Sequence, residues 1–174
     1  MEKRPIVLVG LMGAGKTSIG RALARKLKIP FVDLDQEIEA ISGCSIFDIF
    51  ASYGEQDFRR IEEKVFERVM NEGPEYKIIS TGEGAFITPK IRQLALAKST
   101  TVWLKADLPL LKKRTSFRST RPQLMAGEPG EILSKLMAEQ YPIYANAEIV
   151  IDTADEPLAK TLAKVVKALE RAKN

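Results

Sequence analysis

The sequence predicts an α/β protein in which a five-stranded parallel sheet lies between two layers of helices. Short apolar segments alternate with amphipathic segments along the chain, which is the order that repeated βα units give when the strands run in parallel. The eight residues Gly10 to Thr17, GLMGAGKT, also match the G-x-x-x-x-G-K-[ST] pattern of a phosphate-binding P-loop. These observations predict a P-loop three-layer α/β/α fold formed by a single domain, residues 1–174.

The first βα unit surrounds the P-loop, and the later units follow the same order. Ile6 to Val9 form an apolar, mostly β-branched strand, and Ile19, Leu23 and Leu27 fall on one stripe of the next helix. The expected strands are residues 5–10, 30–33, 77–81, 100–105 and 148–152, and the expected helical segments are residues 15–28, 36–71, 89–98, 107–116, 128–145 and 156–172. Ligand-binding residues are expected along the carboxyl ends of these strands.

The segment after the fourth expected helical segment is the candidate for a mobile lid. Its prolines, glycines and basic side chains favour a lid at about 116–127, although a plain surface loop has a similar composition. Five basic residues fall within ten positions that contain no acid: Lys112, Lys113, Arg114, Arg118 and Arg121. So compact a cluster fits one polyphosphate ligand rather than nucleic acid, and cations are also favoured at a helix end.

Composition excludes several other classes of protein. The net charge of +4 is too small to indicate nucleic-acid binding, and no apolar run approaches the length of a membrane span. The first strand begins too early to leave room for a signal peptide, so we expect a cytoplasmic protein. The single cysteine, Cys44, cannot form an internal disulfide and is expected to pack as a small apolar residue. No exposed apolar stripe is left after core assignment, which favours a monomer.

The P-loop assigns a nucleoside triphosphate, with Mg²⁺, as ligand. Its glycines let backbone N–H groups approach the phosphates, Lys16 brings positive charge to the β and γ phosphates, and the Thr17 hydroxyl can bind Mg²⁺. The residues expected to bind ATP here are Gly13, Ala14, Gly15, Lys16, Thr17 and Ser18. The chain has no histidine, so any general base is a carboxylate, a lysine or water.

Two aspartates follow the second expected strand and face the P-loop. Alternation along Phe31 to Asp35 would bury Phe31 and direct Asp33 and Asp35 the same way. One carboxylate could hold Mg²⁺ through water, and the other could orient or deprotonate a substrate hydroxyl that attacks the γ-phosphate. Asp35 also precedes the helical segment that starts Gln36-Glu37-Ile38-Glu39, so it could be the N-cap of that helix.

The helical region 36–71 contains the segment GEQDFRRIE, Gly54 to Glu62. Charge alone does not assign a function to Arg59, because Glu55 and Glu63 lie at helical spacing and could form ordinary surface ion pairs with it. The order of motifs along the chain, however, resembles the shikimate kinases. The resemblance rests on the P-loop and its continuation to Ala24, on the Asp33-Leu34-Asp35 segment, on GEQDFRRIE and on Thr120-Arg121-Pro122.

On the donor side, the resemblance implies roles for residues at the phosphates and at the adenine. Lys16 and Arg121 would stabilise charge on the transferred phosphoryl group. Thr17 would bind Mg²⁺ directly, with Asp33 and Ser80 behind water. Arg114 and Pro157 would flank the adenine of ATP.

On the acceptor side, the resemblance implies phosphorylation of the 3-hydroxyl of shikimate, on the route to aromatic amino acids. Asp35 would hold the reacting hydroxyl, and Arg59 would bind the substrate carboxylate. The glycine triplet of this family would also face the substrate. Here that triplet reads Gly82-Glu83-Gly84, and the second carboxylate-binding arginine of the family is replaced by Gln140.

These two replacements remove one positive charge and add one negative charge. Glu83 could turn outward or pair with Arg59 or another base, which would leave shikimate acceptable, or the acceptor could be a related cyclic polyol without a carboxylate. Two further alternatives are a nucleoside monophosphate or gluconate kinase, which the GEQDFRRIE segment disfavours, and an ATP-binding homologue without catalysis. The expected partners are therefore ATP and a small-molecule acceptor.

Overall fold

The computed structural model describes residues 3–115 and 127–172. Five strands form one parallel sheet in the order β2-β3-β1-β4-β5. They are β1 (Ile6–Val9), β2 (Phe31–Asp33), β3 (Ile78–Ser80), β4 (Thr100–Lys105) and β5 (Ile149–Asp152). The helices are α1 (Lys16–Leu27), α2 (Leu34–Ser42), α3 (Ile46–Asn71), the 3₁₀ helix η1 (Ala85–Ile87), α4 (Pro89–Lys98), α5 (Leu108–Thr115), α6 (Pro129–Tyr144) and α7 (Leu158–Ala172). The expected α/β fold with five parallel strands is confirmed.

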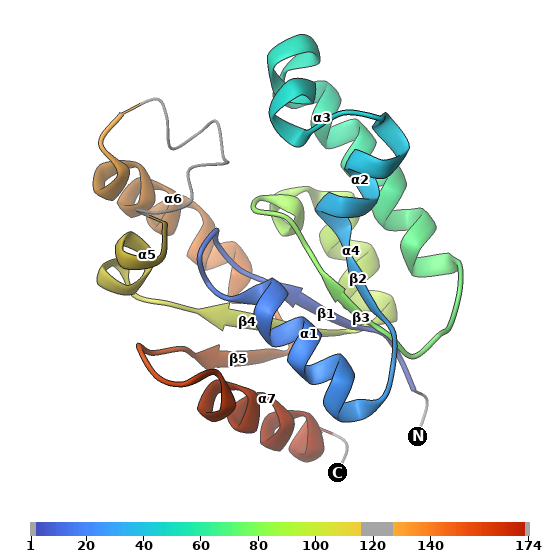
Figure 1. The fold of residues 1–174 in the computed structure, drawn as a ribbon, viewed down its shortest axis with the longest axis vertical. Coiled ribbons are helices and arrows are strands. Elements are labelled where there is room, and N and C mark those ends of the chain that lie inside the picture. The colour runs from blue at the N-terminus through green and yellow to red at the C-terminus, as the bar shows by residue number, and fades with distance from the viewer. Residues whose placement is uncertain (1–2, 116–126, 173–174) are drawn as a thin grey trace.

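Helices cover both faces of the sheet (Figure 1). All four residues of β1 are buried, because successive side chains enter opposite layers of the core. Ile6 and Leu8 pack with residues of α1 and α7. Val7 and Val9 pack with residues of α2 to α6. A central strand buried on both faces explains why its sequence is continuously apolar rather than alternating.

The expected helical region 36–71 is two helices rather than one. Gly43 adopts φ +69° at the end of α2, a conformation that ends the helix, and Ser45 then caps α3 by accepting a hydrogen bond from the backbone N–H of Asp48 at 3.1 Å. A second irregularity lies inside α3, where Gly54 has φ 79° and ψ 172° and kinks the helix. Arg59 lies one and a half turns beyond this kink.

The structure tests the expectation for Cys44 but not the one for the lid. Cys44 is half-buried and packs against the core, as expected. The lid expected at about 116–127, with Arg121, lies outside the described residues except for its last position. In the segments 3–115 and 127–172, no helix is long and apolar enough to cross a membrane.

Candidate active site

The P-loop lines a cleft of about 640 Å³ at the carboxyl ends of the strands. Gly15 precedes α1 with φ 97°, and no side chain caps this helix, so its first N–H groups remain available to an anion. Gly10 has φ 146°, and a Cβ atom there would lie only 2.8 Å from the carbonyl oxygen of Leu104. Both glycines are therefore required by the path of the loop. The cleft is lined by six P-loop and α1 residues predicted to bind ATP: Gly13, Ala14, Gly15, Lys16, Thr17 and Ser18.

Two basic side chains hold the P-loop in this structure. Lys16 is buried, and its Nζ donates to the carbonyl oxygens of Gly10 at 2.6 Å and Leu11 at 2.9 Å. Arg114, from α5, donates through Nη1 to the carbonyl oxygens of Gly13 and Ala14, each at 3.2 Å. The structure thus places Arg114 directly on the loop, where its charge adds to that of Lys16.

The three residues predicted to hold Mg²⁺ lie on adjacent elements. The Thr17 hydroxyl donates to Oδ2 of Asp33 at 3.4 Å, and Ser80 is the register partner of Asp33 on β3. Oδ1 of Asp33 accepts from the backbone N–H of Gln36 at 3.2 Å, so Asp33, not Asp35, is the N-cap of α2. The alternative that Asp35 caps this helix was wrong by two residues, because β2 ends at Asp33 and helical geometry begins at Leu34.

Asp35 instead lies in the first turn of α2 and lines the same cleft as the P-loop. It does not continue the alternation of β2, and Phe31 is half-buried rather than buried. Gly82, after β3, is packed so closely against this carboxylate that a Cβ atom at Gly82 would collide with Oδ1 of Asp35. The carboxylate of Asp35 can therefore occupy this position only because Gly82 has no side chain.

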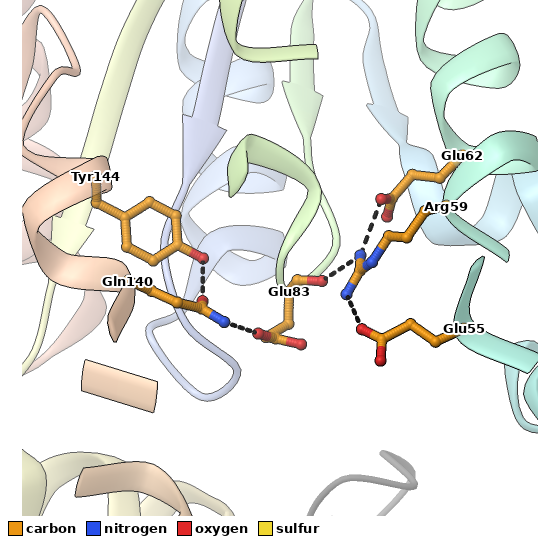
Figure 2. Close-up of polar contacts among 6 residues, drawn as sticks. All are labelled: Glu55, Arg59, Glu62, Glu83, Gln140 and Tyr144. Carbon is orange, nitrogen blue, oxygen red and sulfur yellow. Dashed lines mark hydrogen bonds and ion pairs between the residues drawn. The ribbon is translucent and has the colours of Figure 1, made fainter. Parts of the chain in front are cut away.

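Arg59 lies beside the segment after β3 and contacts the backbone of Glu83 (Figure 2). Its Nη1 donates to Oε1 of Glu62 at 2.9 Å and to the backbone carbonyl of Glu83 at 3.1 Å, and its Nη2 contacts Oε1 of Glu55 at 3.4 Å. The ion pair expected between Arg59 and Glu63 was wrong, because Glu63 pairs with Lys90 at 2.8 Å instead. Burial alone would lower the pKa of Arg59, but Glu62 and the other two carboxylates raise it above its usual value.

Gly84 brings the segment after β3 against Arg59. It has φ +78°, and a Cβ atom at this position would collide with Nη2 of Arg59. The three residues Gly82, Glu83 and Gly84 therefore lie between Asp35 and Arg59, the two groups predicted to bind the acceptor. The structure brings these predicted substrate-binding residues together beside Asp35, which also lines the cleft.

Glu83 neither turns outward nor uses its carboxylate to bind Arg59. Its side chain is 1% exposed, and its Oε1 accepts a hydrogen bond from Nε2 of Gln140 at 2.9 Å. The Tyr144 hydroxyl in turn donates to Oε1 of Gln140 at 3.2 Å. Burial, and then the negative charge of Glu83, raise the pKa of Tyr144 well above its usual value. This favours the neutral phenol, which donates the hydrogen bond to Gln140.

The remaining predicted nucleotide contact, Pro157, is exposed and lies between Glu156 and Leu158, which both line the cleft. Lys113, from the basic cluster expected to fit a polyphosphate, lines the cleft. The sequence prediction assigned no role to Thr81 and Thr153, which also line the cleft and follow strand ends. Their place directly after a strand was the feature of the sequence that could have indicated a role for these two threonines.

The chain matches a family model described as shikimate kinase over residues 12–170. It belongs to the shikimate kinase family. A shikimate kinase from Paramagnetospirillum magneticum is 50% identical over 166 residues, which cover 95% of this chain and 84% of that protein. Another from Mesorhizobium japonicum is 44% identical over 171 residues, which cover 98% of this chain and 83% of that protein. The resemblance inferred from the motifs is confirmed.

The solved structures agree with this assignment. A shikimate kinase from Acinetobacter baumannii, solved in complex with shikimate, has a TM-score of 0.93 and 32% sequence identity to this chain. The match covers 98% of this chain and 94% of that chain. The protein is therefore a phosphotransferase with the P-loop kinase fold of this family, in agreement with the fold and activity class that the sequence predicts.

Proposed function

We propose that this protein transfers the γ-phosphoryl group of ATP to the 3-hydroxyl of shikimate. The observation that supports this most directly is a shared cleft. The P-loop and the carboxylate of Asp35 line it together, and Asp35 contacts the glycine-containing segment that also contacts Arg59. An acceptor bound between Asp35 and Arg59 would thus lie next to the phosphates of ATP. Phosphoryl transfer depends chiefly on such positioning and on positive charge.

On the donor side, backbone N–H groups of the P-loop would bind the phosphates, and Lys16 would leave its carbonyl contacts to reach them. Arg114 adds a fixed charge beside the loop. Arg121, outside the described residues, is proposed to supply a further charge. Pro157, next to the cleft at the start of α7, is proposed to contact the adenine.

Thr17, Asp33 and Ser80 offer only oxygen donors, and a single carboxylate is among them. Such a set suits Mg²⁺, which prefers to keep several waters and to share phosphate oxygens. Mg²⁺ bound there would neutralise negative charge on the phosphates. The 3.4 Å contact between the Thr17 hydroxyl and Asp33 supports this proposal, because it places the two side chains close enough to share one ion or its water.

On the acceptor side, we propose that Asp35 orients the 3-hydroxyl and accepts its proton. The hydroxyl oxygen forms a bond to the γ-phosphorus while the bond from that phosphorus to the bridging oxygen of ADP breaks. Arg59, held by Glu62, would bind the substrate carboxylate. Gly82 and Gly84 would let the acceptor approach the backbone, because neither projects a side chain.

A coupled ADP-release assay with shikimate tests this function. The matched variants are Asp35→Asn and Asp57→Asn, because Asp57 is a half-exposed aspartate on α3 that pairs only with Arg60 among the described residues. We expect Asp35→Asn to lower kcat by roughly 10²- to 10⁴-fold, the usual contribution of a positioned acid–base group. Asp57→Asn should remain close to the parent. ATP binding without turnover of shikimate by the parent would exclude the proposal.

We further propose that the protein acts as a monomer in the cytoplasm. Every described residue that we place at the cleft comes from one copy of the chain, so no second copy is needed to complete it. The reaction also consumes ATP, which the cytoplasm supplies. Light scattering of the protein with Mg-ATP would test the monomer, and a concentration-dependent dimer that alone is active would exclude it.

A further inference from the structure

The carboxylate of Glu83 is buried next to the residues that we propose to bind the acceptor. Its neighbours in sequence, Gly82 and Gly84, contact Asp35 and Arg59 respectively. Figure 2 shows the Glu83 side chain between Gln140 on one side and the guanidinium of Arg59 on the other. An acceptor that extends from Asp35 to Arg59 would pass the segment that carries this carboxylate.

The Glu83–Gln140 pair is built into the fold. Tyr144, which is 1% exposed, donates to Oε1 of Gln140, and this fixes the amide so that Nε2 faces Glu83. Tyr144 is itself held by stacking on Phe86 and Trp103, with ring centroids 6.1 Å and 5.8 Å away. The orientation of Gln140 is thus set by buried aromatic packing.

Only one of the two carboxylate oxygens of Glu83 is satisfied by this arrangement. Oε1 accepts from Gln140, whereas Oε2 is buried and has no hydrogen-bond partner among residues 3–115 and 127–172. A buried charged oxygen without a donor is unfavourable, so an acceptor whose N–H or O–H group reached Oε2 after a shift of the Glu83 side chain would gain by satisfying it. A second carboxylate brings only acceptors.

The charge around Arg59 leads to the same conclusion. Three carboxylates, from Glu55, Glu62 and Glu83, act on this guanidinium. The family's second arginine is absent at Gln140, so the described acceptor end carries one cation and an excess of negative charge. An incoming carboxylate must compete for Arg59 and is repelled by Glu83, whereas a neutral or cationic group is not.

We propose that Glu83 and Gln140 determine acceptor specificity, and that they favour a substituent with a hydrogen-bond donor, such as a carboxamide, a hydroxymethyl or an ammonium group, over a carboxylate. This inference rests on the proposed function for the reaction and for the placement of the acceptor. Shikimate is then an accepted acceptor but not the preferred one, and the preferred substrate class is a cyclic polyol whose group beside Glu83 is neutral or positively charged.

Calorimetric binding in the presence of Mg-ADP tests the proposal with two probes, shikimate and its primary amide. The compounds differ only at the group that would face Glu83. We expect the parent to bind the amide at least 10-fold more tightly. In Glu83→Gln, and in the family-like double variant Glu83→Gly with Gln140→Arg, we expect shikimate to be favoured, a change in the affinity ratio of roughly 100-fold or more.

The matched control is Glu67→Gln, which removes a carboxylate from an exposed position of α3 far along the helix from Arg59. It should leave the affinity ratio unchanged. Tighter binding of shikimate than of the amide by the parent, an unchanged ratio in Glu83→Gln, or no binding of either probe would each overturn the inference.

Turnover measurements on the same proteins separate this inference from the proposed function. If neither the parent nor the double variant phosphorylates either compound, the proposed reaction fails, while the affinity ratio still decides the role of Glu83 and Gln140. If the parent phosphorylates shikimate with a kcat/KM above that for the amide, and Glu83→Gln does not change this order, the reaction stands and the specificity inference fails.

Discussion

The two ends of the cleft are built in different ways. The donor end is formed mostly by backbone, with N–H groups at the start of α1 and carbonyl groups held by Lys16 and Arg114. The acceptor end is formed by side chains from α2, α3 and α6, which meet at the segment after β3. A backbone site depends on a few glycines and one lysine, whereas a side-chain site can change with each substitution.

This difference explains where the chain follows its family and where it departs. The P-loop pattern is complete, because any change at its glycines would strain the loop or block the phosphates. The two departures, Glu83 and Gln140, both lie at the acceptor end and contact each other. The donor end thus fixes the reaction class, and the acceptor end is free to change specificity.

The largest effect in the comparison is expected at the donor end. Lys16→Met removes the charge that would reach the β and γ phosphates, and we expect kcat to fall by roughly 10³-fold, the scale of losing one electrostatic contact in a transition state. Lys26→Met, at an exposed position of the same helix, is the matched control and should have kcat near the parent. Steady-state kinetics with saturating acceptor measure both. An equal loss of kcat in the two variants would show that the reaction is sensitive to any change in α1, rather than to the charge of Lys16.

An intermediate effect is expected at the acceptor end from Gly84→Ala. Gly84 and Gly43 both have positive φ, +78° and +69°, but a Cβ atom at Gly84 would collide with Arg59, whereas nothing lies within 4 Å at Gly43. Both variants should lose about 1–2 kcal/mol of stability through backbone strain. Only Gly84→Ala should also raise the KM for the acceptor, by about 10-fold for a weakened charged contact. Thermal unfolding and kinetics together separate these contributions, and an unchanged acceptor KM in Gly84→Ala would place the acceptor elsewhere.

The sequence predicted the donor end better than the acceptor end because its signals are local. The strand of β1, the P-loop and α1 occupy one continuous segment, so their order and spacing are visible in the chain. Asp33 and Asp35 show the limit of this reasoning. Either could cap α2, and the choice depends on the residue at which β2 ends, which the pattern does not fix.

Contacts at the acceptor end join residues that are far apart in sequence. Glu83 and Gln140 are separated by 57 positions, and no periodicity predicts that they pair. Arg59 has Glu62 and Glu63 at nearly equivalent helical spacings, and only the burial of Glu62 against the core decides which one it binds. Family resemblance identified these positions, but the direction of the Glu83 side chain required the structure.

The smallest effect is expected from Tyr144→Phe, which tests whether the donor end and the acceptor end act independently. Tyr144→Phe removes the hydroxyl that orients Gln140, and leaving the amide oxygen without that donor should cost about 1 kcal/mol of stability. We expect the acceptor KM to change by about 2- to 5-fold, the effect of a fraction of that energy, while the KM for ATP stays constant. Tyr141→Phe is the matched control, because Tyr141 also lies on α6 and its hydroxyl donates to the carbonyl oxygen of Ala106 instead of to Gln140.

Kinetics with each substrate varied in turn measure the two KM values of both variants. An equal change in the KM for ATP and for the acceptor in Tyr144→Phe would mean that α6 couples the two ends. A change confined to the acceptor would show that Gln140 acts only on the group beside Glu83. The second result is expected, because the contacts of Tyr144 and Gln140 lead to Glu83, whereas the P-loop is held from α5 by Arg114.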